Sequence, residues 1–204
     1  MRNYILEDRS TVQIPESWKD INVKQLIALQ NVQDNNIKSQ NKVIQVLTGL
    51  NPEELNFTDY MNVSLTLSDA LSVPKNTQFK KEVEVGGKKF EAKDLKEFTT
   101  REFTDFDTLA GEGKNDNIPI LLALIYSKGV EGDYAETMKA NAKLFENLDA
   151  ETALSAINFF TTACLQFVKS TLDSSEEAKQ AMEKNPKLKE SLKMLENYLD
   201  GAGN

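Results

Sequence analysis

Two glycines between two alternating runs constrain this chain more than any other feature. Residues 81–85 alternate polar and apolar side chains, and residues 88–92 alternate again after Gly86 and Gly87. A two-residue primed turn requires positive φ at both central residues, which glycine adopts without steric cost. The pattern therefore predicts a β-hairpin over about residues 79–92, within a chain whose other segments have helical periodicity.

Apolar residues at helical spacing predict helices on both sides of this hairpin. The expected ranges are 22–29, 37–47, 57–71, 99–106, 118–126, 134–146 and 150–172. The last of these is the longest and most apolar, so we expect it to be the central packing helix. The expected fold class is mainly α, with the hairpin as a small antiparallel sheet.

Two helix starts, 77 residues apart, share one pattern. Asn22 with Gln25, and Thr99 with Glu102, have the spacing of a capping box. In such a box the cap side chain and the third helical residue each bond the other's backbone N–H. An apolar helix, a glycine and a further helix then follow in the same order. The pattern indicates two loosely repeated halves, although capped helices are common enough to arise twice independently.

The helical domain is expected to span residues 1–172, followed by a C-terminal amphipathic helical tail over residues 173–204. Leucines in this tail recur at steps of four, three and four residues, which places them on one face of a helix. They are Leu188, Leu192, Leu195 and Leu199. Such a stripe either packs on the domain, which is the commoner outcome, or binds a partner helix.

An isolated two-stranded hairpin is marginally stable in water, so we expect this hairpin to acquire a third strand. That strand is either Val12–Ile14 of the same chain, which we favour, or an edge strand of another protein. The hairpin lysines either carry function or guard the strand edges against unwanted pairing. The candidate protein-interaction residues are Val83, Val85, Lys88 and Phe90 in the hairpin, and Leu188, Leu192, Leu195 and Leu199 in the tail.

Composition argues against several kinds of function. The chain has no histidine, which removes serine–histidine and cysteine–histidine catalysis and ordinary zinc sites. Its formal net charge of −8 argues against a general nucleic-acid-binding surface, because contacts to phosphates need Lys and Arg. We therefore expect no catalytic residue, cofactor, metal site or small-molecule substrate. An enzyme that uses carboxylates alone is the competing class.

The single cysteine, Cys164, lies within an apolar run and is expected to be a small buried residue rather than a nucleophile. One thiol cannot form an intrachain disulfide and is compatible with a reducing compartment. The N-terminal residues lack the apolar core of a secretory signal, and no apolar run is long and uncharged enough to span a bilayer. We therefore expect a soluble protein with no membrane association.

The order of several short motifs resembles that of a known family. The motifs are Ile14-Pro-Glu-x-Trp18-Lys-x-Ile21, Val46–Leu50, the lysine-rich Gly-Gly hairpin, Leu95–Thr99 with Phe103-x-Asp105, Asn117–Leu121, Tyr134–Phe145 and Phe159-Phe160. Over about residues 12–170 the chain resembles small proteins encoded among the structural genes of tailed phages, notably those of Bacteroides and the crAss-like group.

Such proteins resemble tail-assembly chaperones or minor components of the head–tail region. The resemblance therefore implies a non-enzymatic bacteriophage morphogenesis protein, a chaperone-like adaptor that binds other tail, neck or portal-region proteins. The alternative is a structural component of the virion, in a connector ring or as packaged and ejected cargo. A host-directed regulatory binder is a third class. The implied location is the host bacterial cytoplasm during assembly, or else the virion. Self-association stays open, and no functional residues are transferred.

Overall fold

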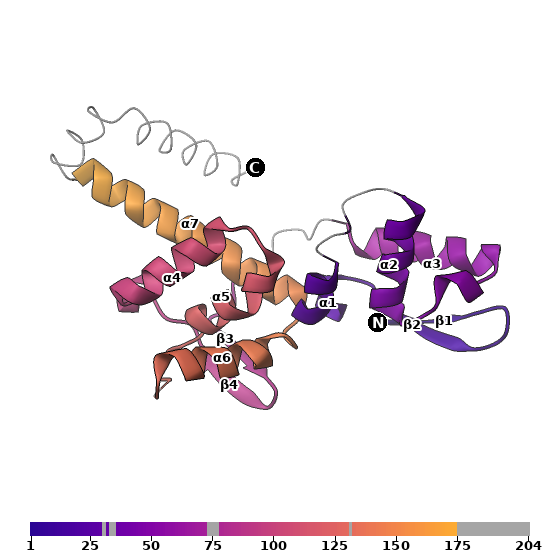
Figure 1. Ribbon diagram of the computed structural model, residues 1–204, viewed down its shortest axis with the longest axis horizontal. Coiled ribbons are helices and arrows are strands. Elements are labelled where there is room, and N and C mark those ends of the chain that lie inside the picture. The colour runs from indigo at the N-terminus through magenta and orange to yellow at the C-terminus, as the bar shows by residue number, and fades with distance from the viewer. Residues whose placement is uncertain (30–31, 33–35, 73–77, 131, 175–204) are drawn as a thin grey trace. The chain divides into compact units, whose positions relative to one another are not determined.

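The computed structural model describes residues 1–29, 32, 36–72, 78–130 and 132–174 (Figure 1). Over these residues the protein is mainly helical, as predicted, with two small antiparallel sheets of two strands each. The α-helices are α1 (Val23–Ala28), α2 (Ile37–Thr48), α3 (Phe57–Ala70), α4 (Thr100–Gly111), α5 (Ile118–Ile125), α6 (Tyr134–Phe145) and α7 (Ala150–Ser174). The strands are β1 (Arg2–Ile5), β2 (Thr11–Ile14), β3 (Glu82–Val85) and β4 (Lys88–Glu91).

Short 3₁₀ turns precede or link several helices. They are η1 (Trp18–Asp20), η2 (Pro52–Glu54), η3 (Leu95–Glu97) and η4 (Asn115–Asn117). All seven helices expected between residues 22 and 172 are present, with ends that differ by a few residues from the predicted ones. The predicted tail helices beyond Ser174 lie outside the described residues.

The described residues divide into two compact units. The first contains residues 1–93 and 98–157, and the second contains residues 94–97 and the part of α7 that begins at Asn158. In the second unit, Phe160 and Cys164 are buried, which confirms the buried position predicted for the thiol. Phe159 is half exposed, and its ring centroid lies 5.6 Å from that of Phe160. The first unit carries the hairpin and most of the core.

The predicted hairpin forms as β3 and β4. Gly86 and Gly87 have φ of 58° and 74°, as a primed two-residue turn requires. Val83 lies opposite Phe90 in the antiparallel register. Gly86 also permits a close approach to α6, because a Cβ atom at this position would lie 3.2 Å from Leu144 Cδ2. The glycine pair therefore sets both the turn and the distance of the hairpin from α6.

The prediction that Val12–Ile14 supplies a third strand to this hairpin was wrong. These residues form β2, which pairs with β1 in a sheet of its own, with Val12 opposite Tyr4. Strand β1 was not predicted, because its short run has weak alternation and five residues separate it from β2. Asp59 of α3 fixes this sheet, since its carboxylate accepts hydrogen bonds from Glu7 N–H at 3.0 Å and Tyr4 Oη at 3.4 Å.

The end of α5 takes the place of the missing third strand. Lys93 N–H donates to the Ile125 carbonyl at 2.9 Å, and Lys128 N–H donates to the Glu91 carbonyl at 3.2 Å. These two bonds run from the outer side of β4 and its extension to the residues around the C-terminus of α5. The hairpin is therefore completed by a helix end within its own unit rather than by a strand.

Aromatic side chains join the hairpin to the helices. The Phe90 ring centroid lies 4.9 Å from that of Phe145, and the Tyr126 ring stacks on Phe145 at 5.7 Å. Tyr126 Oη donates to the Lys80 carbonyl at 2.7 Å. Burial raises the pKa of the Tyr126 phenol, so it stays protonated as that donor. This cluster accounts for the deep burial of the hairpin's apolar face.

Helix α5 is the most enclosed element of the first unit. Seven of its eight residues are buried, and only Ile120, at 38% exposure, reaches the surface. Pro119 occupies the first turn, where its missing N–H costs no helical hydrogen bond. Helix α6 packs along α5 more extensively than any other described pair of helices. The sequence Ile118–Ile125 is apolar on every side, so it can fold only where neighbours surround it.

Three backbone hydrogen bonds tie the N-terminal half to the turn between α6 and α7. Ala150 N–H donates to the Ile21 carbonyl at 2.7 Å, and Val23 N–H donates to the Leu148 carbonyl at 2.9 Å. Lys24 N–H adds a third bond, to the Glu146 carbonyl at 2.9 Å. Ile21 and Val23 are fully buried beside this ladder. Through these bonds, residues 146–150 hold the start of α1 in place.

The two halves repeat the same order of elements. Each has two strands, a 3₁₀ turn, a capped helix and two further helices, and both predicted capping boxes are present. When the residue numbers of the two halves are aligned with an offset of 77, β2 aligns with β4, the end of α2 with the end of α5, and the start of α3 with the start of α6. The buried positions of α3 and α6 do not coincide at this offset. We infer a degenerate internal duplication whose third helices have diverged in packing.

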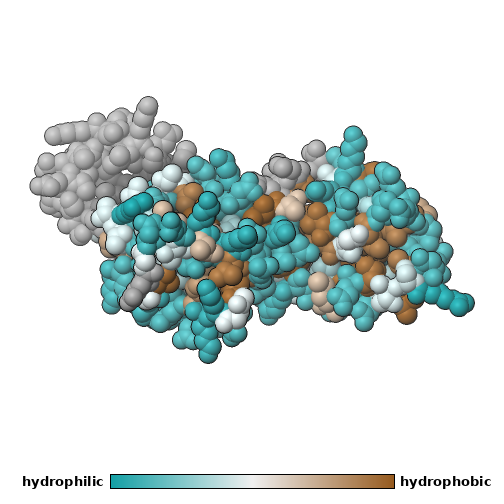
Figure 2. Space-filling model, turned by 60° about the horizontal axis from the view of Figure 1, so that its bottom comes forward, coloured by the Kyte–Doolittle hydropathy of each residue, from teal (hydrophilic) through white to brown (hydrophobic). Residues whose placement is uncertain are grey.

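Some apolar side chains of α3 lie at the surface. Phe57, Met61 and Leu65 are exposed by 80%, 40% and 59%, at steps of four residues along the helix. Val63 and Leu67, on the other side of α3, are fully buried. Figure 2 shows hydrophobic side chains on the surface of the part of the chain that carries β1, β2, α2 and α3. Helix α3 is therefore apolar on two faces and covered on one.

The aromatic contact of the hairpin gives a direct test of its role in stability. We predict that Phe90→Ala lowers the free energy of unfolding by roughly 3–5 kcal/mol, because it leaves a cavity against Phe145. Lys88→Ala, an exposed position on the same strand, is the control and should change it by less than about 0.5 kcal/mol. Urea unfolding followed by circular dichroism measures both values. Equal effects of the two substitutions would contradict the packing described above.

Candidate functional site

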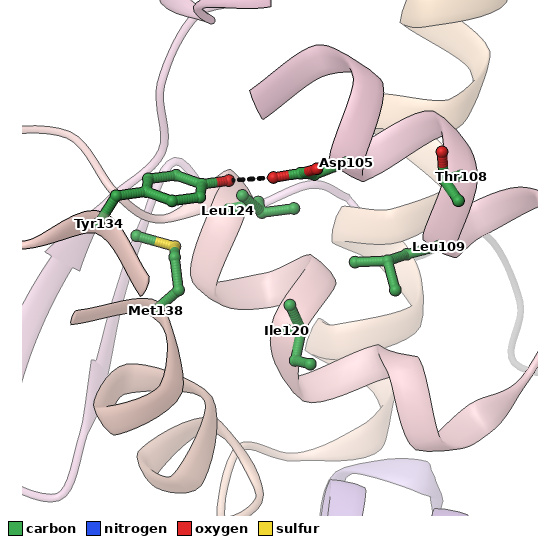
Figure 3. Close-up of a pocket in the computed structure, with 7 residues that line it drawn as sticks. All are labelled: Asp105, Thr108, Leu109, Ile120, Leu124, Tyr134 and Met138. Atoms are coloured by element: carbon green, nitrogen blue, oxygen red, sulfur yellow. Dashed lines mark hydrogen bonds between the residues drawn. The ribbon is translucent and has the colours of Figure 1, made fainter. Parts of the chain in front are cut away.

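A groove lies between α4, α5 and α6 in the first unit (Figure 3). Its volume is about 230 Å³. It is lined by Asp105, Thr108 and Leu109 of α4, by Ile120 and Leu124 of α5, and by Tyr134 and Met138 of α6. Figure 3 shows side chains from all three helices converging on this space.

Helical spacing places each group of lining residues on one face. Ile120 and Leu124 are four residues apart on α5, and Tyr134 and Met138 are four apart on α6. Side chains at this spacing lie one above the other on a helix. The two caps set where these faces begin, since Asp133 accepts from Glu136 N–H at 3.0 Å at the start of α6. The Thr99 capping box does the same for α4.

The groove is apolar along most of its length. Leu124 and Met138 are buried at its base, whereas Ile120 is partly exposed at its opening. Pockets for small molecules and cofactors usually enclose about 300–1,000 Å³ and bury most of the ligand. The present groove is smaller and open to solvent. Its size and lining suit one or two apolar side chains presented by another protein.

The groove has one polar end, which α4 and α6 build together. Tyr134 Oη donates to Asp105 Oδ2 at 2.8 Å, as the dashed line in Figure 3 shows. Arg101 Cζ lies 4.4 Å from the centroid of the Tyr134 ring, and its Nε lies 3.9 Å from Asp105 Oδ2. Burial, together with the hydrogen bond to Asp105, raises the pKa of the Tyr134 phenol. The phenol therefore stays neutral and oriented toward the carboxylate.

A partly buried ion pair anchors the start of α4, a few residues before Asp105 in the chain. Lys93 Nζ lies 2.6 Å from Glu102 Oε1, and the Thr99 N–H and hydroxyl donate to Oε2 of the same carboxylate. Burial raises the pKa of Glu102, but the hydrogen bonds from Lys93 and Thr99 and the charge of Lys93 outweigh it. The pKa of Glu102 therefore lies below its usual value. Glu102 thus links the capping box to the segment that follows the hairpin.

Most of the interaction residues expected in the hairpin lie in the core. Val83, Val85 and Phe90 are buried, and Lys88 is exposed. The expected tail residues lie outside the described part of the chain: Leu188, Leu192, Leu195 and Leu199. Of the four hairpin candidates, Lys88 is therefore the one placed where another protein could reach it.

Sequence reasoning did not find the groove. In the sequence, Asp105 and Tyr134 stood out only as parts of the motifs that carry the family resemblance. Neither residue has a sequence neighbour that marks it, because their contact joins two helices through tertiary packing. The one local signal was the composition of α5. Because this helix is apolar on every side, any part of it that its own fold does not cover, such as Ile120, is a candidate binding surface.

A second hollow of about 520 Å³ lies on α1 and α2. Its lining includes Ala28 and Val32, which correspond to Asp105 and Leu109 at the offset of 77 residues. The α3 residues Phe57 and Met61, which correspond to Tyr134 and Met138, do not line it. The other lining residues of this hollow have no counterparts in the groove, so the two hollows share only part of their lining. This hollow borders residues outside the described set, and we assign it no function.

The described residues contain neither a metal-binding cluster nor a membrane-spanning helix. No group of three or more acidic or cysteine side chains is arranged to hold a metal ion. No described helix combines the length and the apolar character that crossing a membrane requires. In comparisons with known proteins, no family model, curated protein or solved structure matches the chain.

The ion pair at the start of α4 predicts a pH dependence of stability. Because its folded pKa is depressed, Glu102 stabilises the fold at pH values above its unfolded pKa of about 4.5, and this contribution is lost as pH falls through the lower folded value. We predict that Glu102→Gln lowers the free energy of unfolding by about 1–3 kcal/mol at neutral pH. The difference in the free energy of unfolding between Glu102→Gln and the wild type should shrink below about pH 4.5. Denaturant unfolding at several pH values measures this difference.

Glu84→Gln, on the exposed side of β3, is the matched control for this series. It removes the same charge from a side chain that lies at the surface. We expect less than about 0.5 kcal/mol of change for it at neutral pH. A difference for Glu102→Gln that stayed constant from neutral to acid pH would show that the carboxylate charge contributes nothing.

Proposed function

We propose that this chain is a non-enzymatic adaptor of tailed-phage morphogenesis, which binds other tail or neck proteins in the manner of a tail-assembly chaperone. The observation that carries the proposal of protein binding is the groove between α4, α5 and α6, with its apolar lining and its single polar end. The assignment to phage assembly rests on the motif order between residues 12 and 170. Both point to a protein that acts by contact.

The groove supports recognition of a short apolar segment. Leu109, Ile120 and Met138 supply apolar contact area, which gives most of the binding free energy when water is excluded. At the polar end, Asp105 and the Tyr134 hydroxyl are held against each other, so the partner meets a rigid surface. Rigid surfaces lose less conformational entropy on binding. We infer a partner that presents one large apolar side chain flanked by a polar or basic residue.

The alternative function is a structural component of the virion, in a connector ring or as packaged and ejected cargo. The exposed α3 side chains Phe57, Met61 and Leu65 favour it, because permanent assemblies bury such surfaces. Mass spectrometry of purified particles separates the two versions. The chaperone version requires the chain to be absent from the particle, whereas a stoichiometric amount would support the structural version.

Site-specific photo-cross-linking tests the groove as the binding site. We predict that a photoreactive amino acid in place of Ile120 cross-links a phage tail or neck protein in infected cells. The same amino acid in place of Asp107, an exposed residue of α4 outside the groove lining, is the control. Adducts at Ile120 but not at Asp107 would support the groove. Equal adducts at both positions, or none at Ile120, would contradict it.

Affinity measured with the cross-linked partner then tests the chemistry of the contact. Ile120→Glu places a charge at the groove opening and should weaken binding at least about tenfold, or about 1.4 kcal/mol. Asp107→Ala should leave the affinity unchanged. Isothermal titration calorimetry measures both, and circular dichroism checks that the variants remain folded.

A further inference from the structure

The outer face of α3 is built from large apolar and small uncharged residues. Phe57, Met61 and Leu65 stand on it at steps of four residues, together with the exposed Ser68. Ser64 lies at the edge of this face, and its hydroxyl oxygen is buried. The positions at 57, 61, 64 and 68 follow the alternating four- and three-residue spacing of a helix–helix seam. We call these five residues the α3 stripe. A helix that buries Val63 and Leu67 on one side and carries this stripe on the other has two packing faces.

The second half shows how a stripe at this place in the repeat is used. At the offset of 77 residues, Phe57 corresponds to Tyr134 and Met61 to Met138. Met138 is buried against the groove, and Tyr134 is held by its hydrogen bond to Asp105. In the second half this face of the third helix therefore packs against α5, meets α4 at Tyr134, and borders the groove.

The first half lacks an element that could do the same in the described residues. Its capped helix, α1, has six residues, whereas its counterpart α4 has twelve. The α3 face is left open, and Phe57 at 80% exposure is the most exposed large apolar side chain among the described residues. A face that is covered in one repeat and open in the other indicates an intermolecular contact.

We propose that the occupant of this face is the α3 stripe of a second copy of the chain, packed antiparallel about a twofold axis. Charge favours a like chain here. The molecule has a net charge of −8, so most of its surface repels a second copy. The exposed residues of the face carry no charge until the last turn: Phe57, Thr58, Met61, Asn62, Leu65 and Ser68. Two acidic chains can approach most closely where neither presents a charge.

The shape of the stripe is self-complementary in the antiparallel arrangement. An axis midway between Phe57 and Ser68 places each phenyl ring over the serine of the other copy. The same axis places Met61 beside the partly buried Ser64 at the edge of the stripe. Large side chains therefore meet small ones on both sides of the axis, which allows two helices to approach closely. A parallel pair would instead stack Phe57 on Phe57 and serine on serine.

Sedimentation equilibrium of the full chain over a range of protein concentrations tests the dimer. We expect reversible dimerisation in the micromolar range, because a contact of one helix per copy is small for a protein interface. Leu65→Glu and Met61→Glu should each weaken dimerisation at least tenfold, since they bring like charges together. Ala140→Glu, which adds the same charge to an exposed position of α6, should not change it. A monomer at every concentration, or equal weakening by all three variants, would overturn the proposal.

Disulfide cross-linking tests the orientation without relying on loss of association. In a Cys164→Ala background, a chain with both Phe57→Cys and Ser68→Cys should form an intermolecular disulfide on mild oxidation. Phe57→Cys alone should not, because the two copies of residue 57 lie about 16 Å apart along the antiparallel helices, beyond disulfide reach. A fast cross-link by Phe57→Cys alone would show a parallel or unspecific contact. Circular dichroism of each variant confirms that the exposed substitutions leave the fold intact.

Discussion

The burial of α5 is the constraint on which the rest of the first unit depends. Its eight residues have no polar face, so the helix is stable only where other elements enclose it. Helix α6 covers one side, and the hairpin strand β4 closes its C-terminal end through Lys93 and Lys128. The ring of Tyr126, directly after the helix, then stacks on Phe145. The positions of α6, β4 and the Tyr126 ring are therefore set by their contacts with α5 and with the residues at its C-terminus.

The groove is the place where that enclosure is incomplete. Ile120 reaches the surface because α4 and α6 meet at Asp105 and Tyr134 rather than along the whole of α5. A polar contact holds the two helices at that point and leaves apolar surface beside it. The same repeat in the first half has a shorter capped helix and leaves the α3 stripe open. Incomplete coverage in both halves therefore yields the two surfaces proposed for binding.

Local features of the fold could be predicted from the sequence, whereas contacts between distant residues could not. The turn at Gly86 and Gly87 and the two capping boxes depend on residues within a few positions of one another, and both predictions were confirmed. The pairing of β2 was wrong, because strand pairing depends on which partner the tertiary fold brings close. The groove was missed for the same reason. In the sequence, the internal repeat was visible only as two similar helix starts. In the structure, β2, α2 and α3 also align with β4, α5 and α6 at the same offset of 77 residues.

The proposed function depends most on the groove between α4, α5 and α6 being a protein-binding surface. Methyl NMR of the full chain, titrated with the protein cross-linked at Ile120, tests this claim most directly. The methyl signals of Leu109, Ile120, Leu124 and Met138 should shift on binding, whereas those of Val63 and Leu67, buried on the inner face of α3, should not. Unchanged groove signals at saturating partner, with shifts confined to other residues, would contradict the account.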